Sequence, residues 1–384
     1  MKKVTFSVIG LGGRANVYLT ALEQNFPTEF ELIAIAEPDK NKQKLFQERF
    51  KLEDKYIYNS DIEFLKQERL SDVAIVSTQD QLHVPEVVTL LEKGYDIILE
   101  KPIATQMEEV IRLAQIAEKY PNQQIVVCHV LRYTKLFQTL KKIIESKKLG
   151  NVINIQHNEN IGYYHFAHSY VRGPWRNTKE SSPLVVAKSC HDMDILLYLL
   201  NDKHCLRLSS FGNLSLFTKD NYDEQKMAPY CTDCQVETNC PYSALKIYSG
   251  KKIKSVAFDL TSREQFELDL KKSPYGRCVF NCDNNVVDHQ VTILEFESGI
   301  TATFNLSAFT SKIKRTIKIM CEFGEIRACE KPYTIEVHDF RDDEPDTIDL
   351  DVGGGHGGGD KNFIISFMNQ YRNKNESISS LSAS

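Results

Sequence analysis

The feature that most constrains this chain is a glycine-rich turn close to its N-terminus. Gly10, Gly12 and Ala15, with Gly13 and Arg14 between them, form the pattern G-x-G-x-x-A after an apolar, strand-like run and before a run of helical spacing. Gly10 permits a tight turn, the next glycine lets the backbone approach a pyrophosphate, and Ala15 lets helix and strand pack closely. The helix N-terminus adds N–H donors for phosphates. The sequence therefore predicts a dinucleotide-binding turn.

Two charged residues bear on the identity of the dinucleotide. Glu37 follows the second strand-like run, 22 residues beyond Ala15. An acid at this place accepts both ribose hydroxyls and repels a 2′-phosphate, which favours NAD. Arg14 favours NADP instead, because a guanidinium pairs well with a 2′-phosphate. We therefore expect NAD, with NADP left open.

The two halves of the chain differ in their pattern. The first 130 residues alternate strand-like and helical runs, which indicates a doubly wound parallel sheet. From about residue 151 strand-like runs follow one another, interrupted by a helical segment, Cys190–Leu200. We predict an α/β Rossmann domain over residues 1–130 and an α+β domain with a large, mostly antiparallel open sheet over residues 131–384. The expected strands of the first domain are Val4–Ile9, Glu31–Ala36, Val73–Ser77, Tyr95–Leu99 and Gln124–Cys128.

Charge and composition exclude other classes of protein. The chain has 47 Lys and Arg against 52 Asp and Glu, a net charge of −5, which gives no attractive field for nucleic acid. No apolar run approaches the roughly 18 residues of a membrane span, and the first residues are too strand-like for a signal peptide. We expect a cytoplasmic protein that binds neither nucleic acid nor membrane.

Further motifs connect the chain to a known family. The tripeptide Glu-Lys-Pro at residues 100–102 ends a strand-like run, and a His-Asp-Met-Asp motif begins at His191. Thr78 ends the run V-A-I-V-S-T, and His83 follows it closely. With the glycine turn and the A-E-P-D sequence at residues 36–39, these motifs resemble the Gfo/Idh/MocA family of nicotinamide-dependent sugar and polyol oxidoreductases. The resemblance covers nearly the whole chain.

The resemblance implies a substrate bound between the domains, over the nicotinamide, and a catalytic role for two residues. Lys101 matches the family lysine and His191 the family histidine. A lysine cation stabilises charge that develops on the reacting oxygen. A histidine titrates near neutrality and suits proton exchange.

The resemblance also implies a cofactor site and an assembly. We expect a homodimer or homotetramer that uses the second sheet for its contacts. The residues expected to bind the cofactor are Gly10, Gly12, Gly13, Arg14, Ala15, Glu37, Thr78, His83, Glu100 and Lys101.

The chain departs from the family pattern next to the histidine. Many members carry an aspartate four residues before it, where this chain has Ala187, followed by Lys188. The division of acid and base roles is therefore open. Lys188 is interpreted either as a second cation at the site or as a solvated residue.

The segment 157–176 is rich in polar and aromatic groups that suit a hydroxylated ligand. Its arginines also match a carboxylate or phosphate on the substrate. The alternative is an exposed polar loop at a subunit interface. The expected substrate contacts, two of them outside this segment, are Tyr133, His165, His168, Arg172, Trp175, Arg176 and Lys188.

Three clustered cysteines indicate a metal site. Cys231 and Cys234 have the C-x2-C spacing that tetrahedral zinc favours, and Cys240 follows. Cys278 is the preferred fourth ligand, with Cys282 or a histidine as alternatives. We predict a closed, structural zinc site, against the alternative of a loop of reduced thiols.

Taken together, these features predict an NAD(P)-dependent oxidoreductase that transfers a hydride to or from the CH–OH group of a sugar, polyol or sugar derivative. Two alternatives remain open. One is an NAD-using glycosidase that oxidises its sugar transiently, and the other is a non-enzymatic, nucleotide-sensing regulator. A glycine-rich stretch over residues 353–359 is expected to be a flexible loop.

Overall fold

The computed structural model describes residues 2–201, 203–250, 252–253, 258–373 and 377–384. The chain divides into two compact units, each described here by itself. The first comprises Met1–Glu145, Met193–Asp202 and Leu350–Ser384, and the second comprises Ser146–Asp192 and Lys203–Asp349. Each unit thus contains segments that lie far apart in the sequence. The domain limits 1–130 and 131–384 therefore stay a prediction.

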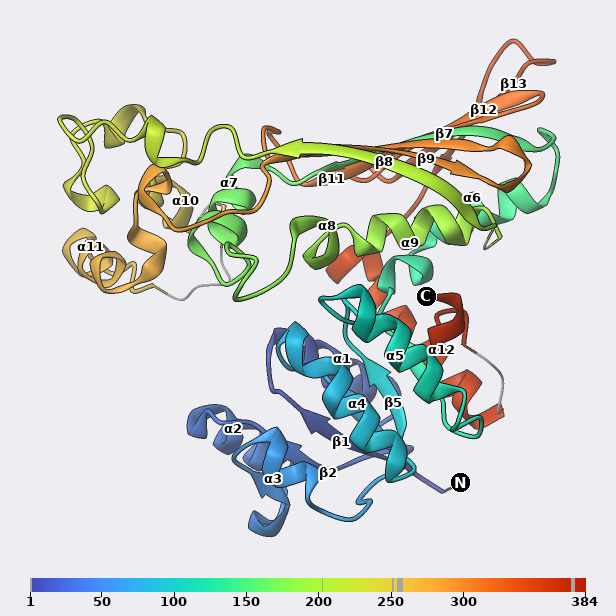
Figure 1. The fold of residues 1–384 in the computed structure, drawn as a ribbon, viewed down its shortest axis with the longest axis horizontal. Coiled ribbons are helices and arrows are strands. Elements are labelled where there is room, and N and C mark those ends of the chain that lie inside the picture. Colours follow the sequence, from blue (N-terminus) through green and yellow to red (C-terminus); the bar gives the residue numbers. More distant parts are fainter. Residues whose placement is uncertain (1, 202, 251, 254–257, 374–376) are drawn as a thin grey trace. The chain divides into compact units, whose positions relative to one another are not determined.

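The first unit contains a six-stranded parallel sheet in the order β3-β2-β1-β4-β5-β6 (Figure 1). This is the doubly wound order of a Rossmann fold, which confirms the predicted fold class. All five expected strands form, and the additional strand β3 is only two residues long. The strands are β1 (Val4–Ile9), β2 (Phe30–Ala36), β3 (Ile57–Tyr58), β4 (Val73–Val76), β5 (Asp96–Leu99) and β6 (Ile125–Val127).

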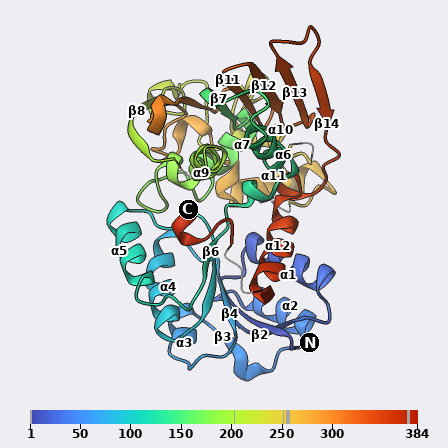
Figure 2. The same ribbon diagram turned by 90° about the vertical axis from the view of Figure 1, so that its right-hand side faces the viewer.

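Helices flank this sheet, and the last of them comes from the C-terminal part of the chain. Helix α12 lies beside α1 (Figure 2), where Phe363 packs against Tyr18 with ring centroids 5.7 Å apart. Apolar residues of both helices thereby complete the core over one face of the sheet. The helices are α1 (Gly13–Asn25), α2 (Lys40–Phe50), α3 (Asp61–Leu65), α4 (His83–Glu92), α5 (Met107–Ala117), α6 (Lys135–Glu145) and α12 (Gly359–Asn373).

The second unit contains an eight-stranded sheet in the order β14-β13-β12-β11-β7-β10-β9-β8. Its described strand pairs are antiparallel except β7 with β10, which confirms the predicted mostly antiparallel sheet. The strands are β7 (Val152–Asn160), β8 (Cys205–Asn213), β9 (His289–Phe296), β10 (Thr301–Ser307), β11 (Lys314–Cys321), β12 (Gly324–Cys329), β13 (Thr334–Asp339) and β14 (Asp346–Asp349).

Short helices accompany the second sheet. They are α7 (Tyr163–Phe166), which continues into a π-helical turn (Ala167–Arg172), α8 (Leu184–Ala187), α10 (Ala244–Tyr248) and α11 (Arg263–Lys272). Helix α9 (Cys190–Leu199) begins in the second unit and continues into the first. It corresponds to the predicted helical segment at residue 190.

The glycine-rich stretch forms a 3-10 turn (Gly355–Gly358) that leads directly into α12. In this turn His356 Nδ1 lies 3.0 Å from a carboxylate oxygen of Asp360. The stretch expected to be a flexible loop therefore forms a defined turn.

Among the described residues, no helix is both long and apolar enough to cross a membrane.

Candidate functional site

The glycine turn at the end of β1 has the shape that a bound dinucleotide requires. Gly10 has a φ of 86°, and a Cβ on it would lie 2.6 Å from the carbonyl oxygen of Ser77. A Cβ on Gly12 or Gly13, by contrast, would meet nothing within 4 Å. No side chain caps the N-terminus of α1 at this point, so its N–H groups remain donors for an anion. The open space lies where the backbone must approach a pyrophosphate.

Glu37 lies beside this turn at the end of β2 and is buried. Its Oε2 accepts the N–H of Leu11 at 2.7 Å, and its Oε1 accepts the N–H of Asp39 at 3.1 Å. These bonds fix the carboxylate next to the glycine turn. The arrangement fits the acceptor of ribose hydroxyls that the sequence predicts.

Arg14 is held by two carboxylates. Its Nε donates to Glu100 at 2.9 Å, and its Nη2 donates to Asp360 at 2.7 Å. Burial opposes ionisation of Glu100, but the charges of Arg14 and Lys101 keep the pKa of Glu100 below its ordinary value. The guanidinium is therefore already neutralised within the protein. Asp360 was not among the predicted site residues, because it lies 346 positions from Arg14 in the sequence.

The remaining predicted cofactor residues lie at the carboxyl ends of β4 and β5, which pair in parallel. The hydroxyl of Thr78 donates to Glu86 at 2.6 Å. Burial raises the pKa of Glu86 to about 8, although this hydrogen bond opposes the rise. His83 Nδ1 lies 2.7 Å from the carbonyl oxygen of Pro102, directly after Lys101, so it braces the backbone at the lysine. This edge of the sheet also carries Gly10.

Tyr133 follows β6 and lies in the core of the first unit. Its hydroxyl is 2.8 Å from Ser379 Oγ and 3.0 Å from Ser377 Oγ. Nearby, the guanidinium of Arg132 binds Asp194, the last residue of the His-Asp-Met-Asp motif, with nitrogen–oxygen distances of 2.7–3.1 Å. Tyr133, expected as a substrate contact, thus has its polar group engaged with the C-terminal segment.

In the second unit, the residue after the predicted catalytic His191 is a buried anchor. Asp192 Oδ1 accepts from Arg315 Nε and contacts His157 Nε2, both at 2.7 Å. Burial opposes its ionisation, but Arg315 and His157 hold the pKa of Asp192 well below its ordinary range. This anchor fixes the first turn of α9, which carries His191, against strands β7 and β11. The sequence motif contains Asp192 but does not show this role.

Lys188 is paired with a buried carboxylate. Its Nζ lies 3.0 Å from Oε1 of Glu159 on β7, and Arg315 Nη2 lies 2.7 Å from Oε2 of the same residue. The Lys188 side chain is only 17% exposed, so the interpretation as a solvated residue is wrong. Position 187 carries an alanine instead of an acid. The carboxylate beside Lys188 comes from Glu159 instead.

Two predicted substrate contacts, His165 and His168, are neutral histidines of the segment after β7. Burial and, to a lesser degree, the charge of Lys188 lower the pKa of His165 to about 3. Burial, with Arg172 nearby, lowers the pKa of His168 to about 4. His168 Nδ1 lies 2.9 Å from the hydroxyl of Tyr248. His165, Lys188 and the carboxylate of Glu159 therefore form one polar cluster of donors and acceptors.

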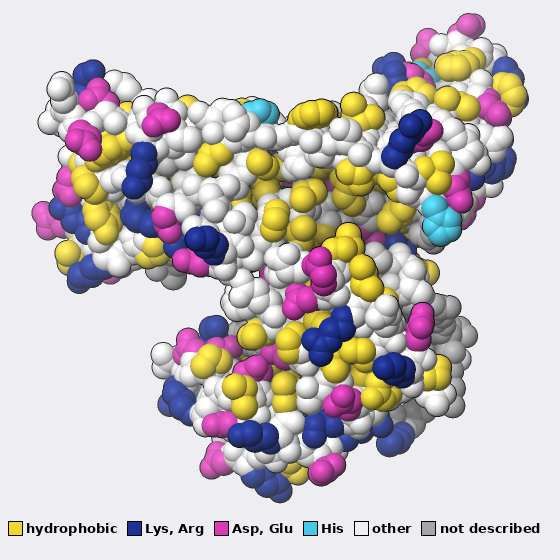
Figure 3. Space-filling model, in the orientation of Figure 1, with side chains coloured by type: hydrophobic (Ala, Val, Ile, Leu, Met, Phe, Trp, Pro, Cys, Tyr) yellow, Lys and Arg dark blue, Asp and Glu magenta, His cyan; other side chains and the backbone are white. Residues whose placement is uncertain are grey.

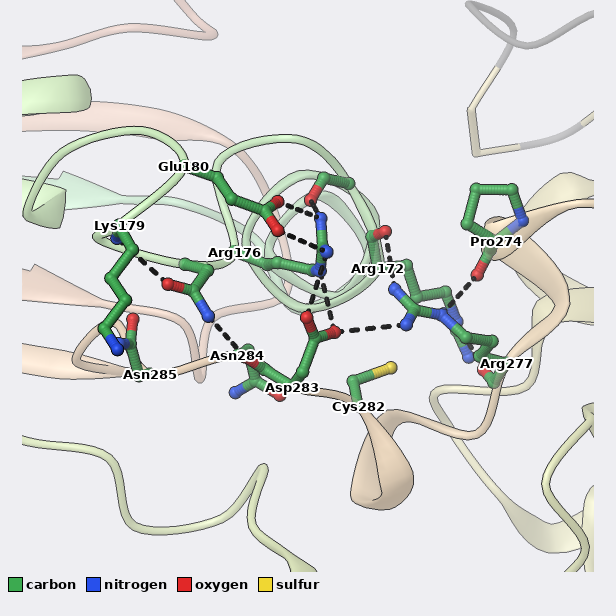
Figure 4. Close-up of polar contacts among 12 residues, drawn as sticks. Arg172, Arg176, Lys179, Glu180, Pro274, Arg277, Cys282, Asp283, Asn284 and Asn285 are labelled. Atoms are coloured by element: carbon green, nitrogen blue, oxygen red, sulfur yellow. Dashed lines mark hydrogen bonds and ion pairs between the residues drawn. The ribbon is translucent and has the colours of Figure 1, made fainter.

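The three other predicted substrate contacts have different surroundings. Arg176 binds Asp283 through Nε and Nη2 at 2.8 and 2.9 Å (Figure 4). Trp175 is 40% exposed. Arg172 is buried and bonds to the carbonyl oxygens of Arg277 and Tyr242 at 2.7 and 2.8 Å. Both arginines are thus engaged within the second unit, and substrate contacts by these three residues stay a prediction.

The four cysteines predicted to bind zinc lie around one cavity. Cys231, Cys234, Cys240 and Cys278 all line it. However, no group of three or more His, Cys, Asp or Glu side chains within the described residues is placed to hold a metal ion. The structure therefore brings the predicted ligands together without supporting a zinc site.

Comparison with known proteins assigns the family. A model described as "Oxidoreductase family, NAD-binding Rossmann fold" matches residues 4–129, and one described as "Oxidoreductase family, C-terminal alpha/beta domain" matches residues 141–384. The chain belongs to this Gfo/Idh/MocA oxidoreductase family. The prediction of an NAD(P)-dependent oxidoreductase is thereby confirmed.

Individual relatives are distant. The Bacillus subtilis (strain 168) protein YteT, provisionally named as an oxidoreductase, is 25% identical over 378 residues, which cover 94% of this chain and 87% of YteT. An inositol 2-dehydrogenase/D-chiro-inositol 3-dehydrogenase of Halalkalibacterium halodurans is 21% identical over 52% of this chain and 53% of its own length. The solved structure of a levoglucosan dehydrogenase with NADH and levoglucosan has a TM-score of 0.72 at 15% identity, covering 100% of this chain and 93% of the other. This last match shows a common fold.

Proposed function

We propose that this protein is an NAD-dependent dehydrogenase of a sugar, a polyol or a sugar derivative. The observation that carries the proposal is the open space over Gly12 and Gly13, bordered by the fixed carboxylate of Glu37. The curated relative that acts on inositols and the solved relative that holds levoglucosan support a hydroxylated substrate.

The preference for NAD over NADP follows from two charged groups. Glu37 places a carboxylate where a 2′-phosphate would be repelled. Arg14, the one feature of the sequence that favours NADP, is neutralised by Glu100 and Asp360. A 2′-phosphate would have to displace these carboxylates from the guanidinium. With Arg14 neutralised, the carboxylate of Glu37 decides the preference, which is for NAD.

The catalytic roles are assigned by the resemblance of the motifs. NAD supplies the hydride acceptor when it is bound. We assign to Lys101 the stabilisation of charge on the reacting oxygen and to His191 the exchange of its proton. The anchoring of the neighbouring Asp192 by Arg315 supports this assignment, because a proton donor needs a fixed orientation.

The polar cluster of the second unit supports recognition of hydroxyl groups. His165 and His168 remain neutral at physiological pH, so their ring nitrogens offer donors and acceptors to a polyol without adding charge. Lys188 and Glu159 balance each other in charge. An uncharged, hydroxylated substrate suits such a neutral set of groups.

We further propose that the chain forms a homodimer or homotetramer through the second sheet. Phe211 and Ile293 are 67% and 50% exposed on the face of this sheet that lies opposite the buried Leu294. Figure 3 shows hydrophobic side chains gathered over this unit. Exposed apolar side chains on a sheet face are typical of an interaction surface.

The cellular location is an inference from the cysteines. None of the ten cysteines forms a disulfide in the structure, and all ten lie among its described residues. A reducing compartment keeps thiols in this state, which supports the expected cytoplasmic location.

The direct experiment is a spectrophotometric screen of sugars, inositols and their derivatives with NAD⁺ and NADP⁺. We expect at least one polyol to give reduced nicotinamide in proportion to ketone or aldehyde product, with NAD⁺ as the better cofactor. Release of an aglycone without net reduced nicotinamide would instead establish the glycosidase. Binding of the nucleotide without turnover of any compound in the screen would favour the regulator.

A further inference from the structure

The second unit contains a hollow lined by positive charges, here called the basic pocket. Its volume is about 480 Å³, and the described residues of its wall include no acid. They include four cations, Arg172, Arg176, Lys272 and Arg277. Glycine, proline, serine and tyrosine complete the wall. Such a lining attracts anions, even though the whole chain carries a net charge of −5.

Two arginines of the basic pocket hold each other through their backbones. Arg172 Nε donates to the carbonyl oxygen of Arg277 at 2.7 Å, and Arg277 Nη2 donates to the carbonyl oxygen of Arg172 at 3.2 Å. Arg277 Nε also donates to the carbonyl oxygen of Pro274 at 3.2 Å (Figure 4). These bonds join the end of the π-helical turn to the loop after α11. They therefore keep two cations close together although the charges repel each other.

Two carboxylates outside the wall compensate part of the charge. Asp283 accepts from Arg176 at 2.8 and 2.9 Å and from Arg277 Nη1 at 3.1 Å (Figure 4). Glu180 Oε2 lies 3.1 Å from Arg176 Nη1. The hydrogen bonds from Arg176 hold the pKa of Asp283 well below its ordinary value, so this carboxylate stays ionised. Together the two acids balance two of the four cations.

The other two cations, Arg172 and Lys272, pair with no carboxylate among the described residues. Lys272 is exposed at the end of α11, whereas Arg172 is only 1% exposed. The guanidinium of Arg172 donates to carbonyl oxygens and to the sulfur of Cys231, and its Nη1 is buried without a hydrogen-bond partner in the described chain. A guanidinium keeps its proton at all physiological pH values, so burial without a counter-charge is costly. An anion in the basic pocket would supply that counter-charge.

We propose that the basic pocket binds the phosphoryl group of a phosphate monoester. This group carries close to two negative charges at neutral pH, which matches the two cations that have no carboxylate partner. A carboxylate would balance only one of them. Guanidinium groups match phosphate oxygens in geometry, and a lysine adds a point charge.

The rest of the wall suits the remainder of such an ester. The Oγ of Ser273 accepts the N–H of Tyr275 at 3.2 Å, and the O–H of this serine is a further donor. Tyr230 and Tyr275 add aromatic rings with hydroxyl groups. The volume of the basic pocket is larger than a phosphate ion needs, so part of the organic group also fits.

The experiment is a calorimetric titration of the full chain with glucose 6-phosphate as the probe. Excess NAD is present throughout, so that the probe does not bind at the glycine turn. We expect one saturable site per chain with a dissociation constant below about 1 mM, and no binding of glucose. Absence of binding at about 10 mM glucose 6-phosphate, or an equal effect of sodium chloride at the same ionic strength, would overturn the proposal.

Two neighbouring lysines give a matched comparison. Lys272→Gln removes an exposed cation of the basic pocket and should weaken binding of the probe at least about threefold. Lys271→Gln is the control, because Lys271 pairs with Asp233 at 2.6 Å and is not part of the wall. Equal affinities in the two variants would overturn the assignment to this pocket.

The buried arginine has a test of its own. Arg172→Gln keeps hydrogen-bond donors but removes the charge, so binding of glucose 6-phosphate should weaken at least about tenfold. Unchanged affinity would contradict the role of the guanidinium. Circular dichroism verifies the fold, and the exposed change Lys272→Gln tests the pocket if Arg172→Gln does not fold.

A turnover assay distinguishes two sources of the phosphoryl group. Reduced nicotinamide formed from a phosphate ester, with none from the parent polyol, would make the group part of the oxidised substrate. Binding of the ester without turnover would make it a second ligand. Both results support the assignment of the pocket. Because the titration measures binding alone, it is independent of whether the protein oxidises a polyol.

Discussion

The Nζ of Lys188 lies 3.0 Å from Oε1 of Glu159, a carboxylate whose side chain is fully buried on β7. Arg315, which also binds Asp192, contacts the other carboxylate oxygen at 2.7 Å, so Glu159 lies between two cations. This pair stands next to the position where many family members carry an aspartate and this chain carries Ala187. The acid of the region thus comes from a strand of the sheet and not from the helix before His191.

Removing that acid should destabilise the fold. Glu159→Gln leaves Lys188 and part of the Arg315 charge without a partner in a buried site, which costs about 3–5 kcal/mol of unfolding free energy. The control is Glu295→Gln, which removes the half-buried partner of the exposed Arg207 and should leave stability nearly unchanged. Urea unfolding of the two variants measures the difference, and equal midpoints would contradict the account.

Glu86 should make stability fall as the pH rises. Burial raises its folded pKa to about 8, whereas the unfolded chain releases this proton near pH 4. Between these values the folded state holds a proton that the unfolded state has lost, so stability declines with increasing pH.

Glu86→Gln removes this penalty while keeping an acceptor for Thr78. We expect the variant to be about 2–4 kcal/mol more stable than the wild type at pH 9 and similar to it at pH 4. Glu92→Gln, an exposed change on the same helix, is the control. A Glu86→Gln variant that follows the wild-type pH profile would show that the carboxyl is ionised in the fold.

Substitutions of two glycines in the same turn should affect different properties, NAD affinity in one case and melting temperature in the other. Gly12→Val fills the open space before the turn and should weaken NAD binding at least about tenfold, or about 1.4 kcal/mol, with little change in melting temperature. Gly10→Ala places a Cβ 2.6 Å from a carbonyl oxygen at positive φ and should lower the melting temperature itself. Calorimetric titration and thermal unfolding separate the two effects. Unchanged NAD affinity in Gly12→Val would show that NAD does not bind at this turn.

The carboxylate of Glu37 should set the preference between the cofactors. Glu37→Gln removes the charge that repels a 2′-phosphate, so the ratio of kcat/KM for NAD to that for NADP should fall about tenfold or more. Glu31→Gln, an exposed change on β2, the strand that ends just before Glu37, is the control. A ratio that is the same in both variants would mean that the preference lies elsewhere.

The sequence predicts much of the first unit, because its signals are local. The apolar runs that became β1, β2 and β4 and the glycine turn were identifiable from neighbouring residues alone. Strand β3 was missed because two residues carry no periodicity. The contact of α12 with α1 depends on residues more than 300 positions apart, for which a single sequence gives no signal.

The same distinction holds for the site. Glu37 was found because its spacing from the glycine turn is fixed by one helix and one strand. Asp360 and Arg315 were missed because their partners, Arg14 and Asp192, are distant in the sequence. Contacts between side chains that meet only through tertiary packing can be identified only from the structure.

The role of Lys101 in hydride transfer is tested by comparing wild-type protein with Lys101→Met and the exposed control Lys142→Met. Reduced nicotinamide and oxidised polyol are followed together. The proposed dehydrogenase mechanism predicts equal amounts of both products in the wild type and in Lys142→Met. In Lys101→Met, kcat should fall about 10²- to 10³-fold while NAD still binds. Turnover in Lys101→Met at the wild-type rate, or polyol conversion without reduced nicotinamide, would contradict it.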